Sequence, residues 1–218
     1  MTWHDLGDRD FQYPNRVLYA VSVYFILLFV CLQQVNIFAP AEFQSRLDRL
    51  RSYMVENDIG ACVLTSYHNI TYFTGFLFCY FGRNYACVVT PETVNTISAG
   101  IDGGQPWRRG YGDNVVYTDW EKTNFYKGVA ESVGEVNGRV ALEFDTVNLE
   151  NFPKYRELFP NKEIVDIGKP TMFMRMKKSV AEIEVIRHGA RIADIGGYAV
   201  VEALEEGRFR LIYFFKKN

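Results

Sequence analysis

Short apolar runs of strand length alternate with helix-length segments between residues 42 and 167, and this alternation constrains the fold more than any other feature. Runs such as ACVLT (61–65) and RVALEF (139–144) have the length and composition of buried strands. Strands that alternate with helices predict a layered α/β sheet. The turn signal Pro91-Glu92 separates two strand-like runs, 85–90 and 94–99, so an antiparallel hairpin should make the sheet mixed.

The individual elements are predicted from the same pattern. The expected strands are 61–65, 85–90, 94–99, 115–118, 139–144 and 163–167, and the expected helices are 42–57, 67–73, 122–133 and 149–158. Ser66 should cap the helix that ends at Gly75. In the first helix, apolar residues recur at helical spacing and charged residues fill the other faces. The expected buried face is Phe43, Leu47, Leu50 and Met54, and the expected outer faces carry Arg46, Asp48, Arg49 and Arg51.

Residues 1–40 differ from the rest of the chain, because an apolar run occupies 17–38 and is purely apolar apart from Ser22 as far as residue 32. Sixteen residues of helix span about 24 Å, short of the roughly 30 Å of a bilayer core. A membrane-associated helix is one interpretation. A signal peptide is another, although Asp5, Asp8 and Asp10 precede the run where a signal has a short basic start. A third is a segment extraneous to the folded unit.

The chain changes character again after Pro170. Ser179 and Glu182 form a capping box, and small and apolar residues then recur at helical spacing to about residue 205. The small residues predict close packing against another element. Residues 208–218 have neither caps nor a period. We therefore expect 171–207 to be a linker and the first helix of a second domain that the sequence does not continue.

Composition limits the possible partners and ligands. The formal net charge is −2, so no basic excess indicates nucleic acid. The four cysteines show no metal-ligand spacing, which predicts buried free thiols and no metal site. The acidic residues Glu121, Glu143, Asp145 and Asp166 are scattered, and we expect solvated or capping roles for them. Trp107 and Trp120 should be packing residues, and His68 and His188 structural ones.

Several motifs together resemble a known family. The stretch TSYHNITYFTGF (65–76) is similar to the signature of the creatinase and aminopeptidase-P-like family. Four more stretches resemble its creatinase branch, and the resemblance covers about 43–205. They are FGR (81–83), IDGGQPWRR (101–109), VYTDW (116–120) and IRHGARIADIGG (186–197).

The resemblance implies a fold, a reaction and a site. It implies a mixed-sheet α/β amino-terminal domain at 41–170, followed by the first helix of a catalytic "pita-bread" domain. It implies a homodimer that hydrolyses creatine to sarcosine and urea without a metal or other cofactor. The catalytic residues of the family belong to the absent domain, so none is expected here. Phe81 and Arg83 match residues that reach the partner subunit's active site.

The chemistry of these two residues fits that role. A planar arginine can hold a carboxylate with two parallel hydrogen bonds, and an aromatic ring can cover a flat guanidinium. Phe81 and Arg83 are thus candidates to bind creatine or a similar guanidino acid, whereas the plainer interpretation is an exposed arginine beside a rim phenylalanine. Two other functions stay open. They are an interaction module, free or membrane-tethered through 17–38, and a fragment of an Xaa-Pro peptidase-like protein. The expected location is cytoplasmic, or membrane-associated through that segment.

Overall fold

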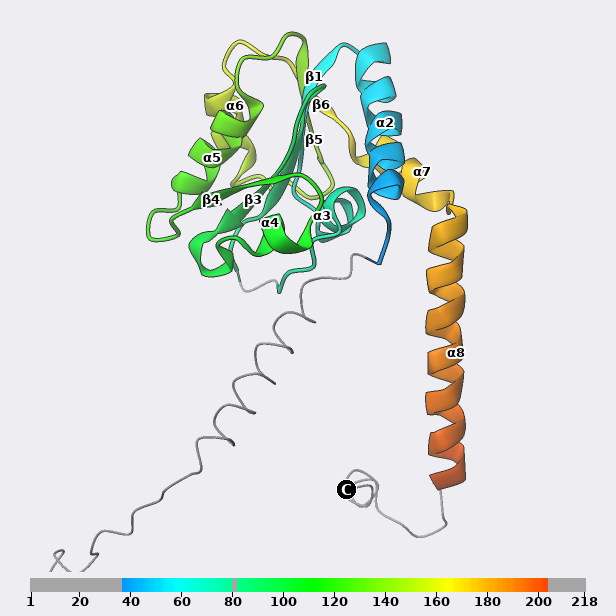
Figure 1. Cartoon of the computed structure of the whole chain (residues 1–218). Coiled ribbons are helices and arrows are strands. Elements are labelled where there is room, and N and C mark those ends of the chain that lie inside the picture. Colours follow the sequence, from blue (N-terminus) through cyan, green and yellow to red (C-terminus); the bar gives the residue numbers. More distant parts are fainter. Residues whose placement is uncertain (1–36, 80–81, 204–218) are drawn as a thin grey trace, which may run out of the picture.

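A single six-stranded sheet with helices on both faces forms the body of the protein, and a long helix extends away from it (Figure 1). This computed structural model describes residues 37–79 and 82–203. The strands are β1 (Ile59–Leu64), β2 (Ala86–Val89), β3 (Val94–Ala99), β4 (Asp113–Tyr117), β5 (Arg139–Leu142) and β6 (Ile164–Asp166). The helices are α2 (Pro40–Glu56), α3 (Tyr67–Thr74), the 3-10 turn η1 (Gly100–Asp102), α4 (Gln105–Arg109), α5 (Asn124–Val133), α6 (Phe152–Leu158), α7 (Gly168–Met176) and α8 (Val180–Ala203).

The sheet is mixed, as the sequence predicts. Its strand order is β4-β3-β2-β1-β5-β6, with β2 antiparallel to both β1 and β3 and the other neighbours parallel. The carboxyl ends of the five mutually parallel strands and the amino end of β2 therefore meet at one edge. Ligands of open α/β sheets bind preferentially outside such an edge.

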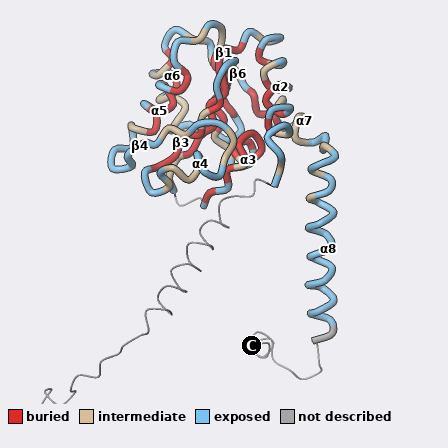
Figure 2. The backbone as a smooth tube through the Cα atoms, viewed as in Figure 1, coloured by how far each residue is buried: buried red, intermediate tan, exposed pale blue. Residues whose placement is uncertain are grey.

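The core has two layers because the central strand β1 is buried on both faces (Figure 2). Its side chains alternate, so Cys62 and Leu64 pack under α2 and α3, whereas Ala61 and Val63 pack under α5 and α6. Burial of each large apolar side chain contributes roughly 1.5–3 kcal/mol, which makes this two-sided packing the main source of stability. The predicted apolar face of α2 is buried in the first layer.

Arg46 corrects one part of the helix prediction, because it is only 2% exposed and does not lie on an outer face. Its Nη1 donates to the Tyr72 carbonyl (2.7 Å), its Nε to Glu42 (3.0 Å) and its Nη2 to Glu182 (3.2 Å). The guanidinium also lies 4.4 Å from the ring centroid of Tyr72. These partners offset the cost of removing the charge from water. Helical periodicity does not reveal that an arginine has such partners.

Three short elements were not expected: η1, α4 and α7. The first two have three and five residues, too few for a periodic signal. In α7, Pro170 lies within the first turn, where a missing N–H costs nothing. The Asp166 carboxylate accepts from the Gly168 N–H (2.9 Å) and so supports the start of this helix.

Local signals elsewhere are confirmed. Ser66 Oγ accepts from the Asn69 N–H (3.1 Å), and Gly75 ends α3 with a φ of 73°. In the capping box of α8, Ser179 N donates to Glu182 (2.8 Å) and Glu182 N donates to Ser179 Oγ (3.1 Å). The glycines of α8, however, have open space around them: a Cβ added at Gly189, Gly196 or Gly197 would meet no described atom within 4 Å. The close packing expected for this helix therefore has no partner within the described part of the chain.

The cysteine prediction is partly wrong. Cys62 and Cys87 are buried free thiols as expected, and burial raises the pKa of both. Cys79 is exposed in the irregular segment that follows α3. Cys31 lies outside the described residues.

The membrane prediction for 17–38 falls almost entirely on residues outside the described part. Among residues 37–79 and 82–203, no helix combines the length and apolarity needed to cross a bilayer.

Candidate functional site

Arg83 lies in the loop before β2, at the edge where the carboxyl ends of the parallel strands meet. Its Nε donates to the carboxylate of Asp119 at 2.6 Å, and about a third of each side chain is exposed. Asp119 follows the end of β4, so the loops after α3 and β4 are joined by this ion pair. Phe81, the other predicted site residue, lies outside the described residues.

The ion pair fixes the guanidinium without using all of its donors. Only Nε is hydrogen-bonded to a described residue, and the two Nη groups have no such partner. The hydrogen bond to Asp119 raises the pKa of Arg83, and the same bond lowers the pKa of Asp119. The arginine therefore presents a charged, oriented fork with its outer N–H groups available to a carboxylate.

Two buried tyrosines hold the backbone next to Arg83. The Tyr117 hydroxyl donates to the Asn84 carbonyl at 2.9 Å, and the Tyr85 hydroxyl donates to Asp102. Burial is the main reason that the pKa of each tyrosine is raised. Both therefore stay neutral donors near pH 7. Gly82 has a φ of 73° and open space around its Cβ position, so this turn uses a conformation that glycine adopts readily.

The tryptophans near this edge contradict the packing prediction. Trp107 on α4 is 67% exposed, and Trp120, the residue after Asp119, is 87% exposed. Ile101 in η1 is also 68% exposed. Residue type alone suggested burial, but both tryptophans lie on short peripheral elements that have no layer above them. Exposed aromatic residues are enriched at protein interfaces.

Glu143 contradicts the solvated or capping role that the sequence predicted for it. It follows β5, is 2% exposed and is neither solvated nor a simple cap. Its two oxygens accept from Ser66 N (2.7 Å), Ser66 Oγ (2.6 Å), Thr65 N and Asn69 Nδ2. The only signal was an acidic residue placed directly after a buried strand. Glu143 thus joins β5 to the β1–α3 turn, and its saturated carboxylate is not free for acid–base chemistry.

Asn69 shows how tightly this network is closed. Its amide also donates to Thr171 Oγ1 (2.9 Å) and accepts from Arg175, which links the turn to α7. Because Asn69 is 1% exposed, the Asn-Ile-Thr sequon at 69–71 is inaccessible in the folded protein.

A small polar hollow of about 90 Å³ lies at the same sheet edge. It is lined by hydroxyl and amide groups, including those of Thr65, Asn148 and Tyr155, and a volume of this order suits a few water molecules. The Thr65 hydroxyl is buried without a partner among the described residues, which a water in the hollow would satisfy.

Neither a metal centre nor a histidine-based site is found in the described residues. No three His, Cys, Asp or Glu side chains of residues 37–79 and 82–203 gather as a metal site would require. His68 and His188 are both exposed, on α3 and α8 respectively.

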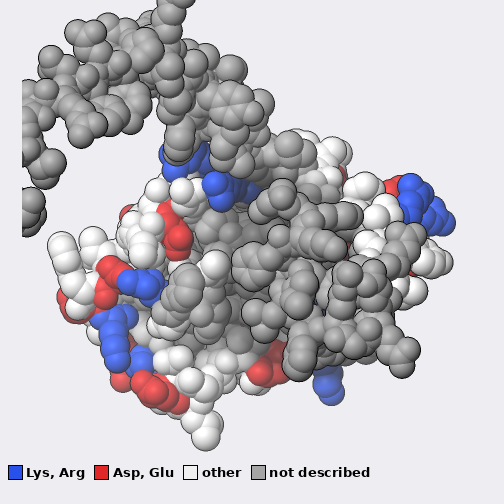
Figure 3. All heavy atoms as spheres, turned by 90° about the horizontal axis from the view of Figure 1, so that it is seen from below, with Lys and Arg blue, Asp and Glu red and all other residues white. Residues whose placement is uncertain are grey.

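On the face shown in Figure 3, basic and acidic side chains of the described residues are interspersed.

Comparison with known proteins places the fold. The model of the creatinase/prolidase N-terminal domain family matches residues 46–177, from the buried Arg46 to the residue after α7.

The chain belongs to the creatinase/prolidase N-terminal domain family.

Relatives within and around this family share the matched region. A creatinase from Bacillus sp. (strain B-0618) is 46% identical over 173 residues, which are 78% of this chain and 42% of that protein. An uncharacterized hydrolase/peptidase from Sinorhizobium fredii is 24% identical over 185 residues, 79% of this chain and 47% of that protein. The chain thus spans less than half the length of these curated relatives.

Solved structures confirm the α/β fold of a creatinase/prolidase N-terminal domain. The Xaa-Pro dipeptidase of Bacillus anthracis has a TM-score of 0.62 at 18% identity, with 78% of this chain and 46% of that chain covered. The prolidase of Pyrococcus horikoshii has a TM-score of 0.61 at 18% identity, covering 75% and 44%. A proline dipeptidase structure from Streptococcus pneumoniae has a TM-score of 0.55 at 19% identity, covering 61% of this chain and 98% of that one.

Proposed function

We propose that this chain provides the substrate-positioning and dimerisation domain of a creatinase-type hydrolase, which converts creatine and water to sarcosine and urea. The observation that carries the proposal is the 46% identity to a Bacillus creatinase over 173 residues. The prolidase and dipeptidase structures share the fold at only 18–19% identity. Sequence similarity therefore favours the creatinase branch.

The geometry of Arg83 fits the recognition of a guanidino acid. Asp119 holds Nε at 2.6 Å, which leaves the two Nη groups to donate parallel hydrogen bonds to the carboxylate of creatine. Such charge-assisted bonds contribute about 1.5–3 kcal/mol each at most, enough to orient a small substrate. Phe81 would cover the substrate's flat guanidinium and exclude water from it.

The same geometry supports a role across a dimer. Arg83 lies at the sheet edge where the strand carboxyl ends meet, and the exposed side chain of Trp120 directly follows its ion-pair partner Asp119. An arginine with an exposed aromatic neighbour suits the interior of an interface with a second subunit, whose active site it would complete.

Catalysis by this chain alone is not part of the proposal. Hydrolysis of a guanidinium carbon needs a general base for water and charge stabilisation around the carbon. Glu143 is saturated by four hydrogen bonds, and His68 and His188 lie on different helices in solvent. The base and the remaining substrate ligands would come from the further part of the enzyme that the relatives contain.

A second candidate is the equivalent domain of an Xaa-Pro peptidase, because the fold is shared with the Bacillus anthracis Xaa-Pro dipeptidase. In that case Arg83 would hold a peptide carboxylate in place of creatine. A third is a stand-alone interaction module, and its exposed surface would be that of α8. The cytoplasmic location that we propose agrees with the buried free thiols Cys62 and Cys87, which reducing compartments preserve.

A chimera tests the first proposal against the second. Residues 37–203 would replace the matching region of the Bacillus creatinase, and urea release from creatine would be measured. We expect creatine turnover, and we expect Arg83→Ala to lower kcat/KM by about 10- to 100-fold because the charge-assisted bonds are lost. Arg83→Lys should fall between the two, since a lysine keeps the charge but not the fork.

Arg156→Ala is the matched control, because Arg156 is an exposed arginine of α6 with no ion pair recorded to a described residue. It should leave kcat/KM unchanged. Creatine turnover that is insensitive to Arg83→Ala would contradict the positioning role. A chimera that folds and dimerises but does not turn over creatine would favour the peptidase alternative.

A further inference from the structure

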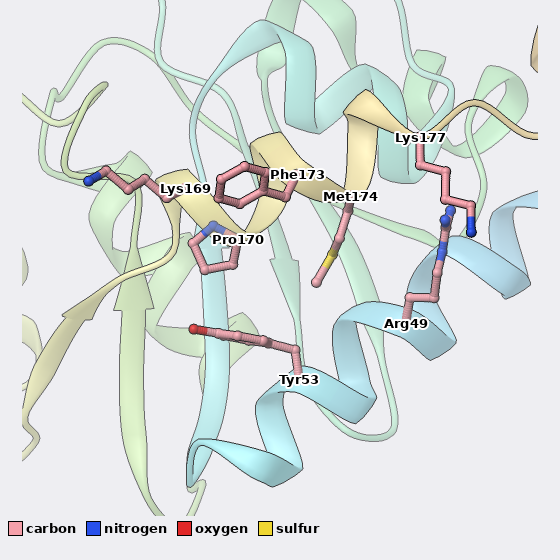
Figure 4. A pocket seen from close by; sticks show the side chains of 7 residues that line it. All are labelled: Arg49, Tyr53, Lys169, Pro170, Phe173, Met174 and Lys177. Carbon is pink, nitrogen blue, oxygen red and sulfur yellow. The ribbon is translucent and has the colours of Figure 1, made fainter.

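A groove lies between α2 and α7, on the side of the sheet away from α5 and α6 (Figure 4). Its volume is about 470 Å³. The floor is apolar and the borders are basic. The floor is made by Tyr53, Pro170, Phe173 and Met174, and the borders by Arg49, Lys169 and Lys177. Phe173 is 61% exposed, so the described residues leave this floor open to solvent.

The three cations of the groove have no carboxylate partner among the described residues. Arg49 of α2 and Lys177, the residue after α7, lie close to each other at one end, and Lys169 lies at the other end (Figure 4). Arg49 Nη2 donates to the Tyr72 hydroxyl at 2.8 Å, but its Nε is buried without an acceptor within the described part of the chain. Like charges brought together are destabilising, and an anionic group between them reverses the sign of that interaction.

We propose that the acidic, aromatic segment 1–13 of this same chain docks in the groove. That segment reads MTWHDLGDRDFQY, with three aspartates against one arginine and the α-amino group. It also carries Trp3, Phe11 and Tyr13, which suit an apolar floor. The opposite terminus does not fit, since RFRLIYFFKKN (208–218) has four basic residues and no acidic one. Charge complementarity thus selects one of the two termini.

The chain enters α2 on the correct side for this docking. The Phe38 ring lies 4.4 Å from the Arg46 guanidinium and packs edge-on against Phe43 at 6.2 Å. Arg46, Arg49 and Tyr53 are three and four residues apart and share one helix face, so the preceding chain starts on the face that borders the groove.

The connection is long enough. About 25 residues separate Tyr13 from Phe38, and even as continuous helix they would span roughly 38 Å. The groove begins at Arg49, nine residues along the chain from Pro40 and so roughly 14 Å along α2. The docked state and a membrane-spanning 17–38 exclude each other, because a spanning helix would place residues 1–13 on the opposite side of the bilayer from the groove.

Zero-length carbodiimide cross-linking of the full-length chain, followed by peptide mass spectrometry, tests the proposal. We expect amide cross-links from Asp5, Asp8 or Asp10 to Lys169 or Lys177. The internal control is the Glu121–Lys127 ion pair, whose atoms lie 3.6 Å apart in the structure. A control cross-link without any cross-link from residues 1–13 to the groove lysines would overturn the proposal.

Charge variants separate specific docking from chance contact. Lys169→Glu with Lys177→Glu removes the amines that the coupling needs, so cross-links from residues 1–13 to the groove should disappear. Asp5→Lys with Asp8→Lys in the same chain should restore cross-linking with the charges exchanged. A circular dichroism melt confirms that each variant folds. Failure of the exchanged variant to recover, with its fold intact, would count against the proposal.

An isotope-mixing experiment identifies which chain supplies the segment. Equal amounts of ¹⁴N- and ¹⁵N-labelled protein are cross-linked together. Cross-links within one isotope support docking in the same chain. Cross-links that join the two isotopes at the random-mixing proportion would show that a second copy occupies the groove and would overturn the intrachain proposal.

Discussion

Replacement of Glu143 by glutamine should destabilise the domain strongly, although the side chain keeps its shape. In the native protein, one carboxylate oxygen accepts from the Thr65 and Ser66 N–H groups, and the other accepts from Ser66 Oγ and Asn69 Nδ2. A glutamine has a single acceptor oxygen, so its amide nitrogen must face at least one of these pairs of donors.

The magnitude is set by the less costly of the two orientations. With the nitrogen toward Ser66 Oγ and Asn69, the serine hydroxyl can rotate and accept, but the Asn69 amide faces another donor. An unsatisfied buried donor costs about 1–3 kcal/mol. The remaining bonds lose their charge assistance, at about 0.5–1 kcal/mol each. We therefore expect Glu143→Gln to lower the free energy of unfolding by about 3 kcal/mol.

Urea denaturation and a thermal melt measure this loss, and the melting temperature should fall by roughly 10 °C for a domain of this size. The control is Glu157→Gln on the exposed side of α6, for which no hydrogen bond to a described residue is recorded. It should change the free energy of unfolding by less than about 0.5 kcal/mol. A loss at Glu143 no larger than that of the control would refute the four-donor account.

Single contacts carry three further predictions. Arg46→Met should lower the free energy of unfolding by about 2–4 kcal/mol, since the partly buried Glu42 and Glu182 carboxylates lose their partner. Hydrogen exchange at the start of α8 should also become faster, and unchanged exchange there would contradict the link. Gly112→Ala should lower the free energy of unfolding by at least about 2 kcal/mol more than Gly82→Ala. Both glycines have positive φ, but only at Gly112 would an added Cβ clash with a carbonyl oxygen, that of Val94. Equal losses of stability in the two variants would refute the steric argument. Burial, followed by repulsion from Glu150, raises the pKa of Tyr126 to about 12, above its unfolded value near 10, so its contribution to stability is complete below pH 10 and is lost as the pH rises to about 12. Tyr126→Phe should remove that part of the alkaline decline in stability, and an unaltered decline would contradict this role of Tyr126.

Most of the fold is readable from the sequence because its strands are short, apolar and separated by clear stop signals. The run 61–65 and the hairpin at 85–99 predicted the central strands and the mixed pairing, and Ser66 and Gly75 marked both ends of α3. Such local features depend on backbone geometry and capping, which act within a few residues and leave a sequence signal.

Long-range polar contacts are what the sequence concealed. Arg46 and Glu143 look like ordinary surface charges, yet both are buried because their partners come from segments far along the chain, Glu182 and the Ser66 turn. No periodicity shows that a charge has such partners. Trp107 and Trp120 failed in the opposite direction, since their size suggested packing but their elements lie at the periphery.

The candidate site was predictable in part. Arg83 was selected by motif resemblance, and the structure adds its ion pair with Asp119 and the two tyrosines that hold its loop. The partner of Arg83 was not foreseen, because it lies in a loop 36 residues away whose position depends on the strand order of the sheet.

Subunit mixing of the creatinase chimera tests most directly the central claim that Arg83 acts in the partner subunit's active site. Two impaired versions of the chimera are mixed. One carries Arg83→Ala, and the other keeps Arg83 but has an inactivating substitution in the catalytic region that comes from the Bacillus creatinase. If Arg83 completes the partner's active site, mixed dimers have one functional site each, and urea release should recover to about a quarter of the wild-type level on random mixing. No recovery beyond the sum of the two inactive parents, with dimer exchange verified, would contradict the claim.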